Sequence, residues 1–71
     1  MKYKVNCNIF DSKGNPQREI ELAAFKYERD AIRYAEVRRD TPHPSYPPEK
    51  RVYYVVEDND VSHPIAVFPT M

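Results

Sequence analysis

The chain has little of the material from which most known chemical sites are built. Its 71 residues include one glycine, one cysteine, two histidines and no tryptophan. A phosphate-binding loop needs several glycines, because its backbone N–H groups must approach the phosphates closely, so P-loop and dinucleotide chemistry are excluded. One cysteine and two distant histidines cannot build the usual four-ligand zinc site. The sequence therefore predicts a protein with no metal ion and no cofactor.

The few residues that could carry catalysis stand apart from one another. His43 and His63 each precede a proline, and neither has a serine, cysteine or carboxylate at a spacing typical of a nucleophile and its base. Cys7 alternates with apolar residues, which is typical of a small core residue. The acidic run 57–60 lacks the length, the glycine and the terminal glutamate of an EF-hand loop. We expect no catalytic residue and therefore no enzyme.

The chain also has no net charge, since its eleven basic and eleven acidic residues cancel. The balance is uneven along the chain: residues 26–39 carry five basic and three acidic side chains, and residues 52–71 carry three acidic and no basic ones. No apolar run approaches the roughly 20 residues of a membrane span, and the first residues lack the apolar stretch of a signal peptide. A lone cysteine cannot form an intramolecular disulfide, which is typical of a reducing compartment. Together, these features predict a cytoplasmic protein without membrane contact.

Alternation of apolar and polar residues predicts two strands in the first third of the chain. Residues 3–9 place tyrosine, valine, cysteine and isoleucine on one face and lysine and asparagine on the other. In a second strand, Ile20, Leu22 and Ala24 share one face. Gly14 lies between the two strands, where a hairpin loop needs a positive φ. These features predict a β-hairpin with a loop longer than two residues.

The pattern becomes helical from about Tyr27. Tyr27, Ala31, Tyr34 and Ala35 fall on one face of a helix, although a tyrosine at the start is an unusual cap. A proline two residues after Asp40 ends the helix. Residues 41–50 contain four of the seven prolines and predict an extended connector between the helix and the third strand.

The last third of the chain predicts a second hairpin. Val52–Val56 is apolar on both faces, which indicates an interior strand. Residues 61–68 predict a fourth strand, which Pro64 confines to an edge of the sheet. The whole chain, residues 1–71, is then one α+β domain in the order ββαββ. We expect a mainly antiparallel sheet in the order second, first, third, fourth strand, with the helix on one face; the alternative pairs the third strand in parallel with the second through a right-handed crossover.

A two-layer domain leaves the sheet face opposite its helix open. From the third and fourth strands we expect this face to carry Tyr53, Val55, Ala66 and Phe68, or the residues that alternate with them. Exposed aromatic area usually marks an interface. Two alternatives stay open: the proline-rich connector folds over this face, or the face forms a homodimer. From the first hairpin the same face would carry Lys2, Lys4, Asn6, Asn8, Phe10, Glu19 and Glu21.

The leading hypothesis is a small non-catalytic module that binds another protein, as accessory proteins of phages and mobile elements do when they inhibit or redirect a host protein. The alternative is a nucleic-acid-binding protein in which helix arginines meet phosphates and sheet aromatics stack on bases, although phosphate binding favours a net positive surface. The candidate partner-binding residues are Phe10, Tyr53, Val55 and Phe68 on the sheet, and Arg29 and Arg33 on the helix.

Overall fold

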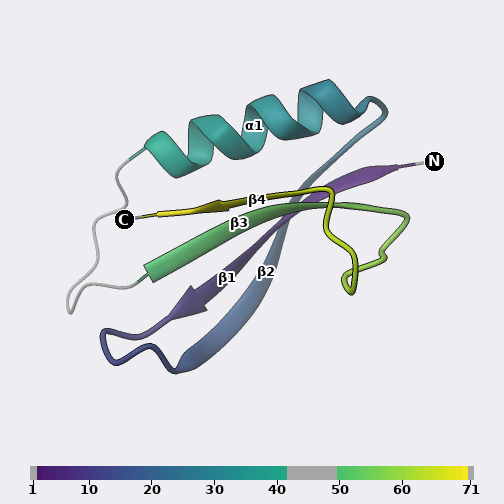
Figure 1. Ribbon diagram of the computed structural model, residues 1–71. Coiled ribbons are helices and arrows are strands. Elements are labelled where there is room, and N and C mark those ends of the chain that lie inside the picture. Colours follow the sequence, from purple (N-terminus) through teal and green to yellow (C-terminus); the bar gives the residue numbers. More distant parts are fainter. Residues whose placement is uncertain (1, 42–49, 71) are drawn as a thin grey trace.

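A four-stranded antiparallel sheet carries one helix on one of its faces (Figure 1). The computed structural model describes residues 2–41 and 50–70. The strands lie in the order β2-β1-β3-β4 and all neighbours are antiparallel, so the predicted α+β fold and strand order are confirmed and the parallel crossover is excluded. Among the described residues no helix is both long and apolar enough to cross a membrane. The elements are β1 (Tyr3–Phe10), β2 (Pro16–Phe25), α1 (Glu28–Asp40), β3 (Lys50–Glu57) and β4 (Ala66–Pro69).

The loop between β1 and β2 is organised by the carboxylate of Asp11. Its Oδ1 atom accepts hydrogen bonds from the backbone N–H groups of Lys13, at 2.9 Å, and Asn15, at 2.8 Å. These bonds, that of Asn15 first, hold the pKa of Asp11 below its ordinary value. Gly14 takes a φ of 87° and donates its N–H to the Asp11 carbonyl, so the only glycine of the chain occupies a position that requires left-handed backbone.

A β-bulge in β2 changes which side chains face the helix. The pairing of β2 with β1 shifts at Leu22, which is the extra residue of the bulge. Beyond it the alternation changes phase, so Ala24 is exposed and Phe25 packs against the core. The ring of Phe25 lies 5.3 Å from that of Tyr34 on the helix. The expectation that Ala24 shares the face of Ile20 and Leu22 is therefore wrong, because it assumed an uninterrupted strand.

The helix lies close to the sheet because its central contact residues are small. Ala31 and Ala35 are both fully buried, and Ile32 and Tyr34 pack beside them. Tyr27 caps the helix without a side-chain hydrogen bond and is 53% exposed, so its predicted place on the buried face is wrong. The position precedes the first helical turn, where the chain is still extended. The fully or almost fully buried core on this side consists of Val5, Cys7, Ile9, Ala31, Ala35, Tyr53 and Val55.

The segment between β3 and β4 forms a tight turn followed by an irregular loop. Asp58 and Asn59 both have positive φ, of 51° and 67°, and the Asp60 N–H donates to the Glu57 carbonyl at 3.0 Å, as in a type I′ turn. The predicted strand from residue 61 is wrong in its first half, since β4 begins only at Ala66. Local hydrogen bonds within residues 59–63 and the proline at position 64 keep this stretch out of the ladder.

The predicted proline-rich connector, residues 41–50, lies almost entirely outside the described residues. Only Thr41, after the helix, and Lys50, the first residue of β3, belong to the described part. The Thr41 hydroxyl donates to the Val37 carbonyl at 2.7 Å, and the Thr41 N–H donates to the Arg38 carbonyl. The helix therefore ends at the predicted place. The alternative in which the connector folds over the sheet concerns residues that lie outside the described part of the chain.

Candidate partner-binding face

Three of the predicted partner-binding residues lie under the helix and not on the open face. Tyr53 is 1% exposed and Val55 is fully buried, both in the core beneath α1. Phe68 packs against the same core, with the Arg39 guanidinium 5.4 Å from its ring centre. Their predicted position is wrong because Tyr53 pairs with Cys7 in the sheet register and so shares the buried face. The residues that alternate with them occupy the opposite face.

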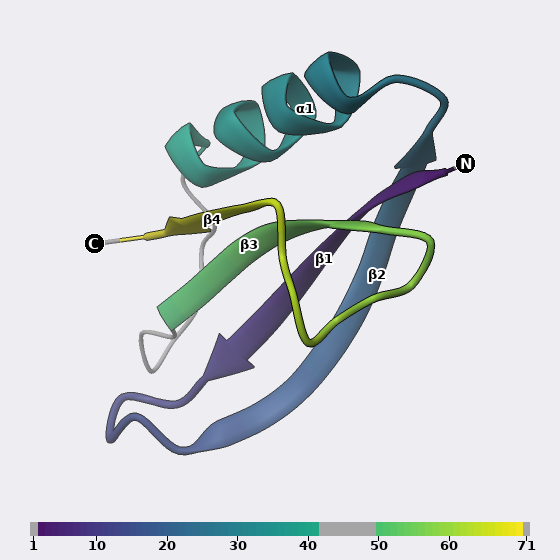
Figure 2. The same cartoon turned by 45° about the vertical axis from the view of Figure 1, so that its right-hand side comes forward.

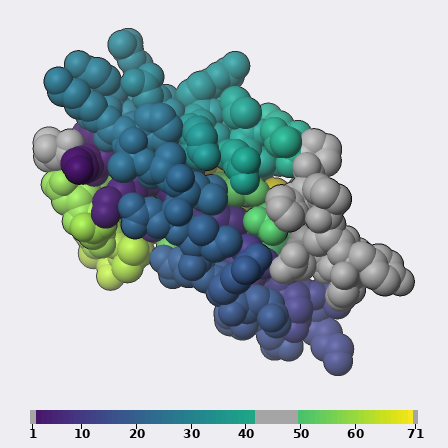
Figure 3. Space-filling model, turned by 180° about the vertical axis from the view of Figure 1, so that it is seen from behind, coloured from purple at the N-terminus to yellow at the C-terminus, as the bar shows by residue number. Residues whose placement is uncertain are grey.

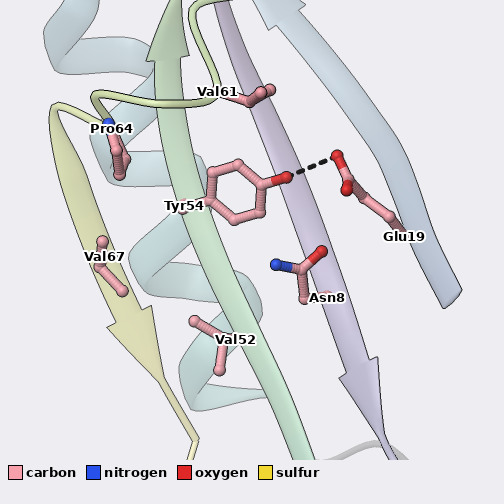
Figure 4. Close-up of a pocket in the computed structure, with 7 residues that line it drawn as sticks. All are labelled: Asn8, Glu19, Val52, Tyr54, Val61, Pro64 and Val67. Atoms are coloured by element: carbon pink, nitrogen blue, oxygen red, sulfur yellow. Dashed lines mark hydrogen bonds between the residues drawn. The ribbon is translucent and has the colours of Figure 1, made fainter. Parts of the chain in front are cut away.

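That opposite face is partly covered by the protein itself. Val56 is fully buried and Tyr54 is 6% exposed, although both alternate with the residues that face the helix. Figure 2 shows the yellow-green segment between β3 and β4 crossing in front of the sheet. In Figure 4 this segment crosses in front of β3, Val61 lies over β1 and Pro64 lies between β4 and β3, and α1 lies behind the sheet. Residues 58–65 therefore act as a cover over one end of the face.

Beside this cover the face is hollowed into a slot of about 300 Å³ (Figure 4). Its walls are aliphatic or proline side chains from β3, β4 and the covering segment, and one end is polar. A second hollow of about 400 Å³ shares Asn8 and Glu19 with it and extends to Phe10, which is half-buried. Of the four candidate partner-binding residues on the sheet, Phe10 is thus the one that lies on this face, together with Asn8 and Glu19, which were also predicted to lie on it. The slot is lined by Asn8, Glu19, Val52, Tyr54, Val61, Pro64 and Val67.

The polar end of the slot is built on a short hydrogen bond between β3 and β2. The Tyr54 hydroxyl donates to Oε1 of Glu19 at 2.6 Å. Burial, and next the hydrogen bond to Glu19, raise the pKa of Tyr54 to about 12, while a hydrogen bond with Asn6 acts in the opposite direction. Among the described residues, neither the second carboxylate oxygen of Glu19 nor the side-chain amide of Asn8 has a protein hydrogen-bond partner. The slot therefore offers free acceptors at a fixed place.

The raised pKa of Tyr54 predicts a loss of stability at alkaline pH. An unfolded tyrosine ionises near pH 10.0, whereas Tyr54 stays neutral in the folded protein up to about 12. Its contribution is therefore complete below pH 10.0 and is lost as the pH rises through about 12. The advantage of the wild type over Tyr54→Phe should shrink by about 2–3 kcal/mol across that range. Urea unfolding of both proteins at several pH values measures it; a constant difference would contradict the buried hydrogen bond.

The two predicted arginines lie on the helix, away from the slot. Arg29 and Arg33 are exposed, and the Arg29 guanidinium lies 5.9 Å from the ring centre of Tyr27. Figure 3 shows the teal residues of the helix along the upper side of the molecule and the yellow-green covering segment at its lower left. The two arginines therefore do not lie beside the slot. They also do not lie on one surface with the predicted stacking aromatics, since Tyr53 is in the core and Phe68 packs against it.

Val61 and Pro64 were missed as residues of this face, and Val52, Tyr54 and Val67 were predicted only as the alternating set, because their signals are weak in the sequence. Val61 and Pro64 belong to a stretch predicted as a strand, and Tyr54 is indistinguishable from Tyr53 by residue type. Alternation did place Asn8 and Glu19 on this face, and Glu19 can accept a hydrogen bond from a tyrosine two strands away. The pairing register of the strands would have been needed to identify Tyr54 as that tyrosine.

The remaining chemistry-bearing side chains form no further site in the described part of the chain. No group of three or more histidine, cysteine, aspartate or glutamate side chains there could hold a metal ion. Cys7 is fully buried, and this burial raises the pKa of its thiol. His63 is exposed and lies 3.2 Å from the Asp60 carboxylate within one turn. Comparison of the chain with protein-family models, curated proteins and solved structures gives no match.

Proposed function

We propose that this protein is a small non-catalytic module that binds a larger protein through the sheet face opposite its helix. The observation that carries the proposal is the slot together with the apolar rim beside it. Val61 is 55% exposed, Ile65 38% and Val67 51%, and all three lie in the covering segment or in β4. Clustered exposed apolar side chains next to a hollow favour protein binding.

The edges of the sheet favour contact through a face and not through strand pairing. The edge strand β2 begins with Pro16, carries charged side chains such as Arg18 and contains the bulge at Leu22. The other edge strand, β4, has four residues and ends in Pro69. Prolines, charges, bulges and short length are the features by which natural sheets prevent edge-to-edge association. The proposal therefore assigns binding to side chains of the open face.

The proposal includes the setting in which such a module would act. A cytoplasmic location is supported by the free, buried thiol of Cys7, since disulfides are rare in that compartment. An accessory protein of a phage or mobile element that inhibits or redirects a host protein is the kind of role that fits a small chain with a single binding face. A second copy of the chain is the alternative occupant of this face.

Affinity capture with two matched valine variants tests the proposal. The immobilised protein is exposed to lysate of its native cell, and Val67→Arg is compared with Val37→Arg, because Val67 on the sheet and Val37 on the helix are similarly exposed, at 51% and 48%. We expect wild type and Val37→Arg to retain the same protein in stoichiometric amount and Val67→Arg to lose at least about 90% of it, since the new side chain fills the slot and removes apolar contact.

Two results would contradict the proposal. One is that no protein is retained, or that Val67→Arg retains as much as wild type. The other is retention that disappears after nuclease treatment or in the double variant Arg29→Ala/Arg33→Ala, which would favour the nucleic-acid alternative. Analytical ultracentrifugation of the isolated protein separates self-association from binding of another protein.

A further inference from the structure

We propose that the slot on the open face receives an arginine side chain of the partner protein. The inference rests on the proposed function and names the chemistry of the contact. It follows from three properties of the slot: the shape of its walls, the acceptors at its polar end, and the sign of the charge around it.

The walls of the slot suit the aliphatic part of a long side chain. Val61, Pro64 and Val67 present hydrocarbon surface to the slot. In Figure 4, Pro64 and Val67 lie on one side of the Tyr54 ring, the polar end lies on the other, and Val61 lies above the ring. A volume of about 300 Å³ is at the small end of the range for ligand sites. Arginine buries its methylene stem against such surface while its charged head reaches a polar group.

The polar end of the slot offers two acceptors from two strands. One is the Glu19 carboxylate, of which one oxygen is held by the Tyr54 hydroxyl and the other is free within the described part of the chain. The other is the amide of Asn8, whose side chain lies beside Glu19 in Figure 4. A guanidinium carries five donors in a planar fork, so it can satisfy both acceptors at once. The bond from Tyr54 fixes the carboxylate in advance, which lowers the cost of binding.

The charge of the slot lining favours a cation, because Glu19 is the one charged side chain among the described residues that line it. Arg18 lines the adjoining hollow, but no lysine or arginine of the described part of the chain lines the slot itself. On the same sheet face, the ammonium group of Lys4 lies 3.6 Å from the Glu21 carboxylate and so is paired with a different acid. Glu19 is therefore the acid on this face that remains available to a basic side chain. A guanidinium is more weakly hydrated than an ammonium and loses less on entering a partly apolar slot.

Binding of small arginine analogues to the isolated, full-length protein tests the inference without a partner. The probes are N-acetyl-arginine methylamide, its lysine equivalent and its citrulline equivalent, which has nearly the shape of arginine but no charge. Two-dimensional NMR follows the backbone and side-chain amides of the ¹⁵N-labelled protein. We expect millimolar binding of the arginine probe, with the largest shifts at the Asn8 side chain and at Val67, and at least about fivefold weaker binding of the lysine and citrulline probes.

The matched variants are Glu19→Gln and Glu21→Gln. Both change an exposed acid on the same face of β2, and glutamine at position 19 still accepts the Tyr54 hydroxyl. We expect Glu19→Gln to weaken the arginine probe about tenfold, because a charge-assisted bond is lost, and Glu21→Gln to leave it unchanged. Equal binding of arginine and citrulline, equal binding of arginine and lysine, unchanged binding in Glu19→Gln, or no shifts at the slot would each overturn the inference.

The same variants separate this inference from the proposed function. A partner protein that is captured by the wild type and equally by Glu19→Gln would leave the proposed function standing and overturn the arginine assignment. Specific binding of the arginine probe at the slot without any captured protein would support the arginine assignment and contradict the proposed function.

Discussion

Replacement of Tyr53 by alanine is expected to remove most of the stability of this protein. Tyr53 is 1% exposed and is the largest fully buried side chain in the described core. Truncation of a buried aromatic residue typically costs about 3–5 kcal/mol, because apolar burial is lost and a cavity remains. A domain of this size has a total free energy of unfolding of roughly 4–10 kcal/mol. Urea unfolding followed by circular dichroism should show a large fall in the transition midpoint.

Tyr27→Ala is the matched control for this prediction. The Tyr27 side chain is 53% exposed and contacts only the long cations Lys26 and Arg29 among the ring contacts described. Its loss should change the free energy of unfolding by less than about 1 kcal/mol. Similar losses from the two substitutions would contradict the assignment of Tyr53 to the core beneath the helix.

The second large effect is expected from Phe25→Ala, which tests the β-bulge. Because the bulge at Leu22 changes the phase of β2, Phe25 packs against the core and lies 5.3 Å from the ring of Tyr34. Phe25 is only half-buried, so we expect a loss of about 2–3 kcal/mol, below the range for a fully buried phenylalanine. Thermal and urea unfolding would both report this loss.

The neighbouring residue supplies the control. Ala24 is exposed and pairs with Lys4 on the open face, so Ala24→Glu should change stability by less than about 1 kcal/mol. In a strand without the bulge, Ala24 would face the core, and a glutamate there would be a buried charge with a far larger cost. A greater loss from Ala24→Glu than from Phe25→Ala would therefore show that the alternation is unbroken.

The strand order could be predicted from the sequence because several local features agree. The alternation in residues 3–9 and the loop at Gly14 indicate a first hairpin, and the helical period between Tyr27 and Asp40 indicates one helix. Pro64 excludes the last segment from the centre of the sheet. Only an arrangement with the third strand beside the first makes all neighbours antiparallel and leaves this segment at an edge, and this is the observed order.

The buried face of β3 could not be predicted because both of its faces are apolar. Val52–Val56 contains no polar residue that would mark the solvent side. The choice is made by register, which places Tyr53 opposite Cys7 and Tyr54 opposite Asn6. A shift of one residue would exchange the two tyrosines between the faces. The bulge in β2 is hidden for the same reason, since consecutive alanines at positions 23 and 24 fit either phase.

The slot depends on features that no local pattern in the sequence reports. The covering segment, residues 58–65, was predicted in part as a strand, and its position over Tyr54 and Val56 is a tertiary contact. The bond between Tyr54 and Glu19 joins residues 35 positions apart across three strands. Sequence patterns predicted a sheet face opposite the helix, but its partial cover and the unpaired acceptors of its described residues appear only in three dimensions.

The most direct test of binding through the open face is amide hydrogen exchange of the protein alone and bound to the partner that it captures. Binding through the open face predicts increased protection in residues 58–65 and in β4, where exposed side chains border the slot, and no change in α1. Increased protection confined to α1, with residues 58–65 and β4 unchanged, would contradict the assignment of binding to this face.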